Sequence, residues 1–208
     1  MEKATLLCDP YNVIITGVGG QGNVMASRIL GNMLSVKGLQ ITIGETFGAS
    51  QRGGSVMSHL RISAASTWSP QIPEGRGHMV VALEPIEALR VLMVYGNPQT
   101  KVLCNTRAIQ PISVICGDSD YPSLNYLKQS ILELTENAWF VDATDAALKL
   151  GDPIYGNIMM IGALAAIGDL PMDQEDFRAV ISKTMTSKKM AANLCAYDTG
   201  ARMIDNKK

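Results

Sequence analysis

Cysteine is scarce in this sequence of 208 residues, and its four copies stand far apart at Cys8, Cys104, Cys116 and Cys195. No C-x-x-C pair and no cluster of cysteine with histidine occurs. Iron–sulfur clusters and structural zinc sites need several closely spaced thiolate or imidazole ligands. The sequence therefore predicts no metal site and no iron–sulfur cluster in this chain. It predicts four free thiols, as is usual in the reducing cytoplasm.

The sequence also lacks an excess of charge of one sign and a long hydrophobic run. Its 18 Lys and Arg residues balance 19 Asp and Glu residues, so the formal net charge is −1. Proteins that bind nucleic acid or an anionic membrane through their overall charge are basic, which this chain is not. The longest apolar stretch, residues 158–167, is too short to cross a bilayer, and residues 1–9 lack the apolar core of a signal peptide. We therefore expect a cytoplasmic protein whose partners include neither nucleic acid nor a membrane.

Aromatic residues make up only 5% of the chain, whereas hydrophobic residues make up 47% and are mostly aliphatic. Short apolar runs, typical of buried strands, alternate with segments whose apolar residues have helical spacing, and from residue 143 onwards only helical patterns remain. We predict a single domain over residues 1–208, with a three-layer α/β/α fold, a mostly parallel but mixed, Rossmann-like sheet and a helical C-terminal segment. Expected strands cover residues 13–15, 40–44, 56–63, 78–83, 101–104, 112–115 and 139–141. Expected helices cover residues 24–36, 85–95, 123–134, 156–167 and 188–204, and another begins at Asp173.

The first predicted strand runs into a glycine-rich turn, residues 17–22 with the sequence G-V-G-G-Q-G, and then into a helix. Gly17, Gly19 and Gly22 have the spacing G-x-G-x-x-G, in which glycine permits a tight turn and a close approach of a ligand to the backbone. Because the first amides of a helix have no partner within it, such a turn suits an anionic group such as a phosphate. Glu45, which follows the second predicted strand, is spaced like the acid that binds a ribose in dinucleotide sites. The turn alone is compatible with a nicotinamide or flavin dinucleotide, with another ligand, or with a purely structural reversal of the chain.

A second glycine-rich and polar loop covers residues 46–55 and contains one arginine, Arg52. Loops of this kind carry function more often than the elements that they join. In the strand that follows, apolar residues alternate with His59 and Arg61. No second histidine or pair of acids adjoins His59 in the sequence, so we assign no catalytic residue to this chain.

Taken together, the two loops resemble those of the gamma-type domain of the 2-oxoacid:ferredoxin oxidoreductases, most closely the beta subunits of the indolepyruvate ferredoxin oxidoreductases. That family typically has G-x-G-G-Q-G in the first loop and Q-R-G-G-S-V-x-S-H-x-R in the second. Both motifs are present here, at residues 17–22 and 51–61. Further matches at residues 141–143, 157–164 and 193–200 extend the resemblance over almost the whole chain.

The resemblance implies a subunit of a complex that oxidatively decarboxylates an arylpyruvate or related 2-oxoacid, transfers the acyl group to coenzyme A and passes electrons to ferredoxin. In that family, thiamine diphosphate and iron–sulfur clusters do this chemistry and sit on a partner subunit, and the cysteine pattern agrees with that division. We therefore expect this chain to bind no cofactor alone, to need a cofactor-bearing catalytic partner and to be inactive in isolation. Ferredoxin would be reached only through the complex. A surface meant for the partner would also let the isolated chain form a homo-oligomer.

We hypothesise that both loops meet at the carboxyl ends of adjacent strands, where open α/β sheets place their sites. There Arg52, oriented by Glu45 and His59, would join the backbone amides in holding an anionic group of coenzyme A, or would brace the catalytic subunit. The candidate cofactor-binding residues are Gly17, Gly19, Gly20, Gln21, Gly22, Gln51, Arg52, Gly53, Gly54 and Ser55. One alternative is that these residues shape an intersubunit contact and touch no ligand. Outside the family, the alternatives are a free-standing NAD- or FAD-binding oxidoreductase and a scaffold that binds no small molecule.

Overall fold

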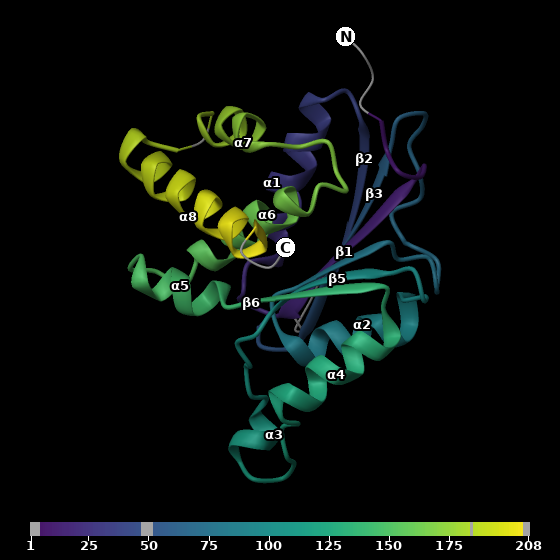
Figure 1. Ribbon diagram of the computed structural model, residues 1–208, viewed down its shortest axis with the longest axis vertical. Helices are drawn as coiled ribbons and strands as arrows, with labels where there is room; N and C mark the ends of the chain where they lie inside the picture. Colours follow the sequence, from purple (N-terminus) through teal and green to yellow (C-terminus); the bar gives the residue numbers. More distant parts are fainter. Residues whose placement is uncertain (1–4, 47–51, 184, 206–208) are drawn as a thin grey trace.

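A mixed sheet of six strands, in the order β2-β3-β1-β4-β5-β6, forms the centre of the molecule in the computed structural model (Figure 1). The structure describes residues 5–46, 52–183 and 185–205. The strands are β1 (Tyr11–Val18), β2 (Gln40–Glu45), β3 (Ser55–Ser63), β4 (Met79–Ala82), β5 (Lys101–Asn105) and β6 (Asn137–Val141). Strand β1 is parallel to β4, β4 to β5, and β5 to β6. Strand β3 runs antiparallel to both β1 and β2. The predicted mostly parallel, mixed sheet is confirmed.

Helices cover both faces of the sheet. They are α1 (Asn23–Val36), α2 (Pro85–Tyr95), α3 (Ile112–Ile115), α4 (Leu124–Leu134), α5 (Ala143–Lys149), α6 (Tyr155–Ile167), α7 (Gln174–Ile181) and α8 (Ser187–Asp205). Helices α1, α6 and α8 pack over one face and α2 and α4 over the other, each above its own apolar core (Figure 1). The predicted three-layer fold with a helical C-terminal segment is therefore confirmed.

Three helices begin at the residues where the sequence has capping signals. Glu84 caps α2, whose first residue is Pro85, and the Ser123 hydroxyl accepts a hydrogen bond from the first turn of α4. A reciprocal capping box between Asp173 and Asp176 opens α7. These local bonds satisfy amides that have no partner within the helix, and they explain why the predicted starts agree with the structure.

Residues 112–115 form the short helix α3, so the predicted strand there is wrong. The amides of Val114 and Ile115 both donate to the carbonyl oxygen of Pro111, at 3.0 and 3.1 Å, which closes a helical turn. A short apolar run does not distinguish a strand from a helix by periodicity. The neighbouring place in the sheet beside β5 is taken by β6, and Ile115 is 70% exposed.

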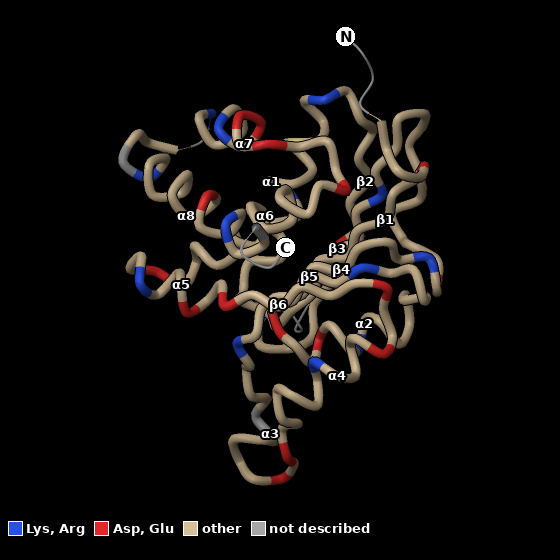
Figure 2. Tube along the Cα trace, viewed as in Figure 1, with Lys and Arg blue, Asp and Glu red and all other residues tan. Residues whose placement is uncertain are grey.

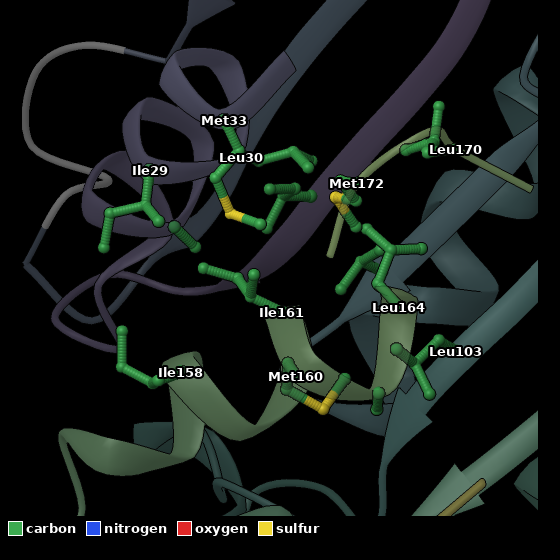
Figure 3. Packing of buried hydrophobic residues seen from close by; sticks show 14 of the residues in the cluster. Ile29, Leu30, Met33, Leu103, Ile158, Met160, Ile161, Leu164, Leu170 and Met172 are labelled. Atoms are coloured by element: carbon green, nitrogen blue, oxygen red, sulfur yellow. The ribbon is translucent and has the colours of Figure 1, made fainter. Parts of the chain in front are cut away.

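Helix α6 is the centre of the larger core. Its residues 156–164 are all buried, and it carries no charged residue, whereas acidic and basic residues are mixed over the outer helices and loops (Figure 2). Ile158 and Ile161 of α6 face Ile29 and Leu30 of α1 (Figure 3). A helix that is apolar on all sides is stable only when it is surrounded, which explains its hydrophobic sequence.

Helices α6 and α8 cross with their backbones in close contact at two glycines. A Cβ atom on Gly162 would lie 2.0 Å from the carbonyl oxygen of Tyr197, and one on Gly200 would lie 1.9 Å from that of Met159. Any side chain at either position would force the two helices apart. In the described part of the chain, no helix is both long enough and apolar enough to span a membrane.

Candidate functional site

The two glycine-rich loops lie side by side at one edge of the sheet. The amide of Gly19 donates to the carbonyl oxygen of Gly54 (2.8 Å), and the amide of Gly53 donates to the carbonyl oxygen of Gly19 (3.1 Å). The loops meet because Val18, which ends β1, pairs with Ser55, which begins β3. The expected position needs one correction: since β3 is antiparallel, the second loop enters this edge at the amino end of β3 and not at the carboxyl end of a strand adjacent to β1. Gln51 lies outside the described residues.

The side chain of Gln21 folds back over the end of β1 instead of pointing into solvent. Its Oε1 accepts a hydrogen bond from the amide of Val18 (2.7 Å), and its Nε2 donates to the carbonyl oxygen of Leu83 (3.0 Å). A Cβ atom on Gly17 would lie 2.6 Å from that Oε1. Any side chain at the first glycine of the turn would therefore displace this glutamine side chain from its two hydrogen bonds. Gln21 in turn ties the end of β1 to the residue after β4.

The last glycine of the turn marks the start of α1. Gly22 has a φ of 90°, and no side chain caps the helix at this end. The amide of Ala26 is the first to bond to Gly22, so the preceding amides of the first turn have no partner within the helix. A Cβ atom on Gly22 would lie 2.2 Å from the Nδ2 atom of Asn157 on α6. The left-handed backbone favours glycine here, and any side chain would also displace the Asn157 side chain.

A cleft of about 490 Å³ opens beside this helix start, between the glycine turn, the residues that follow β4, β5 and β6, and the first turn of α6. Helix α1 leads from β1 towards the β2–β3 side of the sheet, whereas α2 leads from β4 towards β5. The cleft thus lies at the point where the strand order reverses, which is where open α/β sheets bind ligands. Its volume is in the range of sites for small molecules. Gly20, Gln21 and Gly22, three of the predicted site residues, line it.

The polar part of the cleft contains, among the described residues, one cation, Arg107, and one carboxylate, Asp152. Asn157 is buried, and in the part of the chain that the structure describes its Nδ2 atom has no hydrogen-bond partner. Arg107 lines the same cleft and pairs with Asp145 at 2.9 Å, with both side chains about half exposed. One carboxylate, that of Asp152, also lines the cleft, and its Oδ1 accepts from the amide of Ile154 (2.9 Å). With the open amides of α1, this arrangement favours an anionic group.

Arg52 is exposed on the second loop and does not line the cleft. Neither of the residues expected to orient it does so. The carboxylate of Glu45 accepts from the Ser27 hydroxyl of α1 (3.1 Å), whereas Nδ1 of His59 accepts from the amide of Ile72 (3.0 Å). Burial lowers the pKa of His59, as expected for an imidazole held neutral. The two side chains lie on opposite faces of the sheet, so the expectation that Glu45 and His59 together orient Arg52 is wrong.

Ser55, another predicted site residue, also points away from the cleft. Its hydroxyl donates to the carboxylate of Glu87 on α2, which is buried and also pairs with Arg90. Ser55 therefore anchors the second loop to the helix on the opposite face of the sheet.

Sequence reasoning missed three residues of the cleft: Asn105, Arg107 and Asn157. Asn105 is fixed by hydrogen bonds to Leu83 and Thr144 that join the ends of β4, β5 and β6. Asn105 and Arg107 could have been found, because polar residues after a predicted parallel strand lie at the carboxyl edge of the sheet. The position of Asn157 in the sequence does not indicate that it lines the cleft, since it lies in an apolar helix more than a hundred residues from the turn. Among the described residues, no group of three His, Cys, Asp or Glu could hold a metal ion.

Comparison with known proteins identifies the family. Residues 12–203 match the model of the pyruvate ferredoxin/flavodoxin oxidoreductase family. The chain belongs to this family. Indolepyruvate oxidoreductase subunit IorB of Pyrococcus horikoshii is 36% identical, over 92% of this chain and 95% of its own. The same subunit of Archaeoglobus fulgidus is 37% identical, over 91% and 92%. The crystal structure of the keto/oxoacid ferredoxin oxidoreductase gamma subunit from Geobacter sulfurreducens has the same fold, with a TM-score of 0.71 at 18% identity over 96% of this chain and 98% of that one.

These findings confirm the predicted gamma-type resemblance and the role as a subunit of a 2-oxoacid:ferredoxin oxidoreductase. The strand order of this chain also differs from that of a dinucleotide-binding fold. In that fold the second strand lies next to the first, so its terminal acid reaches the ribose. Here β3 lies between β1 and β2, which moves Glu45 one strand further from the glycine turn.

Proposed function

We propose that this chain is the subunit of an indolepyruvate-type, arylpyruvate-oxidising 2-oxoacid:ferredoxin oxidoreductase that carries no redox cofactor, and that it holds an anionic part of coenzyme A in the cleft beside α1. The printed names of the relatives that match almost end to end support the substrate class. The observation that carries the coenzyme A site is the guanidinium of Arg107 in a cleft that also borders the glycine turn and the uncapped start of α1.

The chemistry of coenzyme A suits this cleft at both ends. Its phosphates are anionic and match the helix amides and Arg107, because charge-assisted hydrogen bonds are the stronger kind. The uncharged part of coenzyme A matches the apolar wall of the cleft, to which Met25, Leu83 and Met160 contribute. Arg107 can exchange its partly exposed pair with Asp145 for a phosphate without leaving a buried charge behind.

The thiol of coenzyme A must reach an acyl group on another subunit, so the mouth of the cleft has to face that subunit. Thiamine diphosphate and iron–sulfur clusters there supply the decarboxylation and the electron transfer to ferredoxin. We assign the exposed Arg52, on the loop tied to Gly19, to the contact that braces this catalytic partner beside the cleft. The four free cysteines suit a complex that works in the cytoplasm.

The test of this proposal is reconstitution with the cofactor-bearing partner subunit. The two chains are expressed together, purified through a tag on this chain and assayed for reduction of an artificial electron acceptor. We expect a complex whose activity requires both indolepyruvate and coenzyme A, with this chain inactive alone. Faster turnover of pyruvate or 2-oxoglutarate than of arylpyruvates would refute the substrate class. Activity that does not depend on coenzyme A would refute the role of the cleft.

A further inference from the structure

One segment of the chain extends beyond the layered fold. Residues 106–123, here called the arm, connect β5 to α4 and carry α3, which stands apart from the sheet (Figure 1). The beginning of the arm forms part of the cleft wall through Arg107 and Ile109. Most of residues 110–120 are exposed, and the hydrogen bonds among residues 111–117 are local turns. These local bonds do not explain how the arm keeps its place beside the cleft.

Both ends of the exposed part of the arm are attached to one buried carboxylate. The Oε1 atom of Glu84 accepts hydrogen bonds from the amide of Ile109 (3.3 Å) and from the hydroxyl of Tyr121. Its Oε2 accepts from the amide of Glu87 (3.0 Å), which caps α2. Glu84 is only 1% exposed. A single side chain, at the residue before α2, therefore joins three segments of the chain.

Capping alone does not account for this glutamate. A helix cap needs one acceptor atom, which is Oε2, and a serine or aspartate provides it at less cost. Burial raises the pKa of Glu84, and the bonds from Tyr121, Glu87 and Ile109 oppose that rise. A buried carboxylate is costly unless several donors compensate it. Two of the three donors here belong to the arm.

We infer that Glu84 is a positioning residue that fixes the arm so that Arg107 and Ile109 form a wall of the coenzyme A cleft. The effect on coenzyme A binding rests on the proposed function, whereas the attachment of the arm to Glu84 does not depend on any ligand. Thr106 and Arg107 fix the first residues of the arm to Asp142 and Asp145. Beyond them, Ile109 and Tyr121 are held by Glu84.

Hydrogen exchange of the full chain tests the attachment without any ligand. Tyr121→Phe removes one donor to Glu84, together with the hydroxyl that accepts from the amide of Ile86, and leaves the bond from the Glu87 amide to Glu84 in place. We expect the amides of residues 107–120 to exchange roughly tenfold faster or more, because a bond to a charged group is lost. Tyr126→Phe is the matched control, since Tyr126 is 63% exposed on the first turn of α4, and it should leave exchange unchanged. Unchanged exchange in Tyr121→Phe would overturn the inference.

Kinetics of the assembled enzyme test the consequence. We expect Tyr121→Phe to raise the KM for coenzyme A about three- to tenfold, with kcat and the KM for indolepyruvate within about twofold of the wild type. Glu84→Gln should do the same, because an amide oxygen cannot serve all three donors. An unchanged KM in Tyr121→Phe, when Arg107→Ala raises it, would refute the positioning role and leave the cleft proposal standing. An unchanged KM in both variants, with faster exchange in Tyr121→Phe, would refute the coenzyme A site.

Discussion

Replacing Gly162 by alanine is expected to destabilise the protein, although alanine is the better helix former. On α6 the gain in helix propensity is about 1 kcal/mol. Against it, the new Cβ would lie 2.0 Å from the carbonyl oxygen of Tyr197, a contact that must open to at least 3.0 Å. This oxygen belongs to the backbone of α8, so the two helices have to separate. Separation by this amount loses a substantial part of the dispersion energy along the whole contact.

The magnitude follows from these opposing effects. Overpacking of a well-filled core costs about 1–3 kcal/mol, and more when backbone must move. With the propensity gain subtracted, we expect Gly162→Ala to lower the free energy of unfolding by about 2 kcal/mol. For a chain of this size, that corresponds to a fall in Tm of about 4–8 °C.

Gly156→Ala is the matched control, because it lies on the same helix. A Cβ there would meet its nearest atom, in the backbone of Thr144, at 3.7 Å, an ordinary contact. We expect this variant to be as stable as the wild type or slightly more stable. Both variants are measured by urea denaturation and calorimetry. If Gly162→Ala is as stable as Gly156→Ala, the close helix crossing is refuted.

Three further predictions concern single groups. Tyr197→Phe should raise the free energy of unfolding by about 1 kcal/mol in urea denaturation, because the buried Tyr197 hydroxyl has no partner among the described residues; a loss of stability would contradict this. Gln21→Ala should lower the free energy of unfolding by about 1–3 kcal/mol, since the amide of Val18 loses its acceptor, and denaturation midpoints equal to the wild type would count against the fold of the turn. Burial lowers the pKa of both His59 and His78, with a nearby arginine adding to the shift of His78. Unfolded histidines take up protons near pH 6.5, so the stability that the buried neutral rings contribute is present above that pH and is lost as the pH falls towards 5. Urea titrations at pH 7, 6 and 5 measure the loss, and NMR titration of either imidazole above pH 6.5 would contradict it.

Much of the fold could be predicted because its signals are local. The strand before Gly17, the helix after Gly22 and the cap of α7 all depend on residues close together in the sequence. The meeting of the two glycine-rich loops was also predicted, although the direction of β3 was not. Strand β3 could pair with β1 or with another strand, and a single sequence does not show which pairing is the more stable.

The remaining parts of the site depend on contacts between distant segments. Asn157 belongs to the cleft only because α6 packs against the start of α1, and nothing near it in the sequence indicates this. The sequence predicts that His59 helps to orient Arg52, but the segment that contains Ile72 folds over His59 and buries it on the face of the sheet opposite Glu45. Tertiary packing, and not local pattern, decides the environment of both residues.

The dissociation constant of coenzyme A for the assembled complex tests the central claim most directly. It is measured by isothermal titration calorimetry for the wild type, for Arg107→Ala, and for Arg178→Ala as a control on α7, where the half-exposed arginine pairs with Glu175. We predict that Arg107→Ala weakens binding about tenfold, the loss expected for one charge-assisted hydrogen bond, whereas Arg178→Ala binds as the wild type does. Wild-type affinity in Arg107→Ala, or equal affinity of the catalytic partner without this chain, would contradict the account.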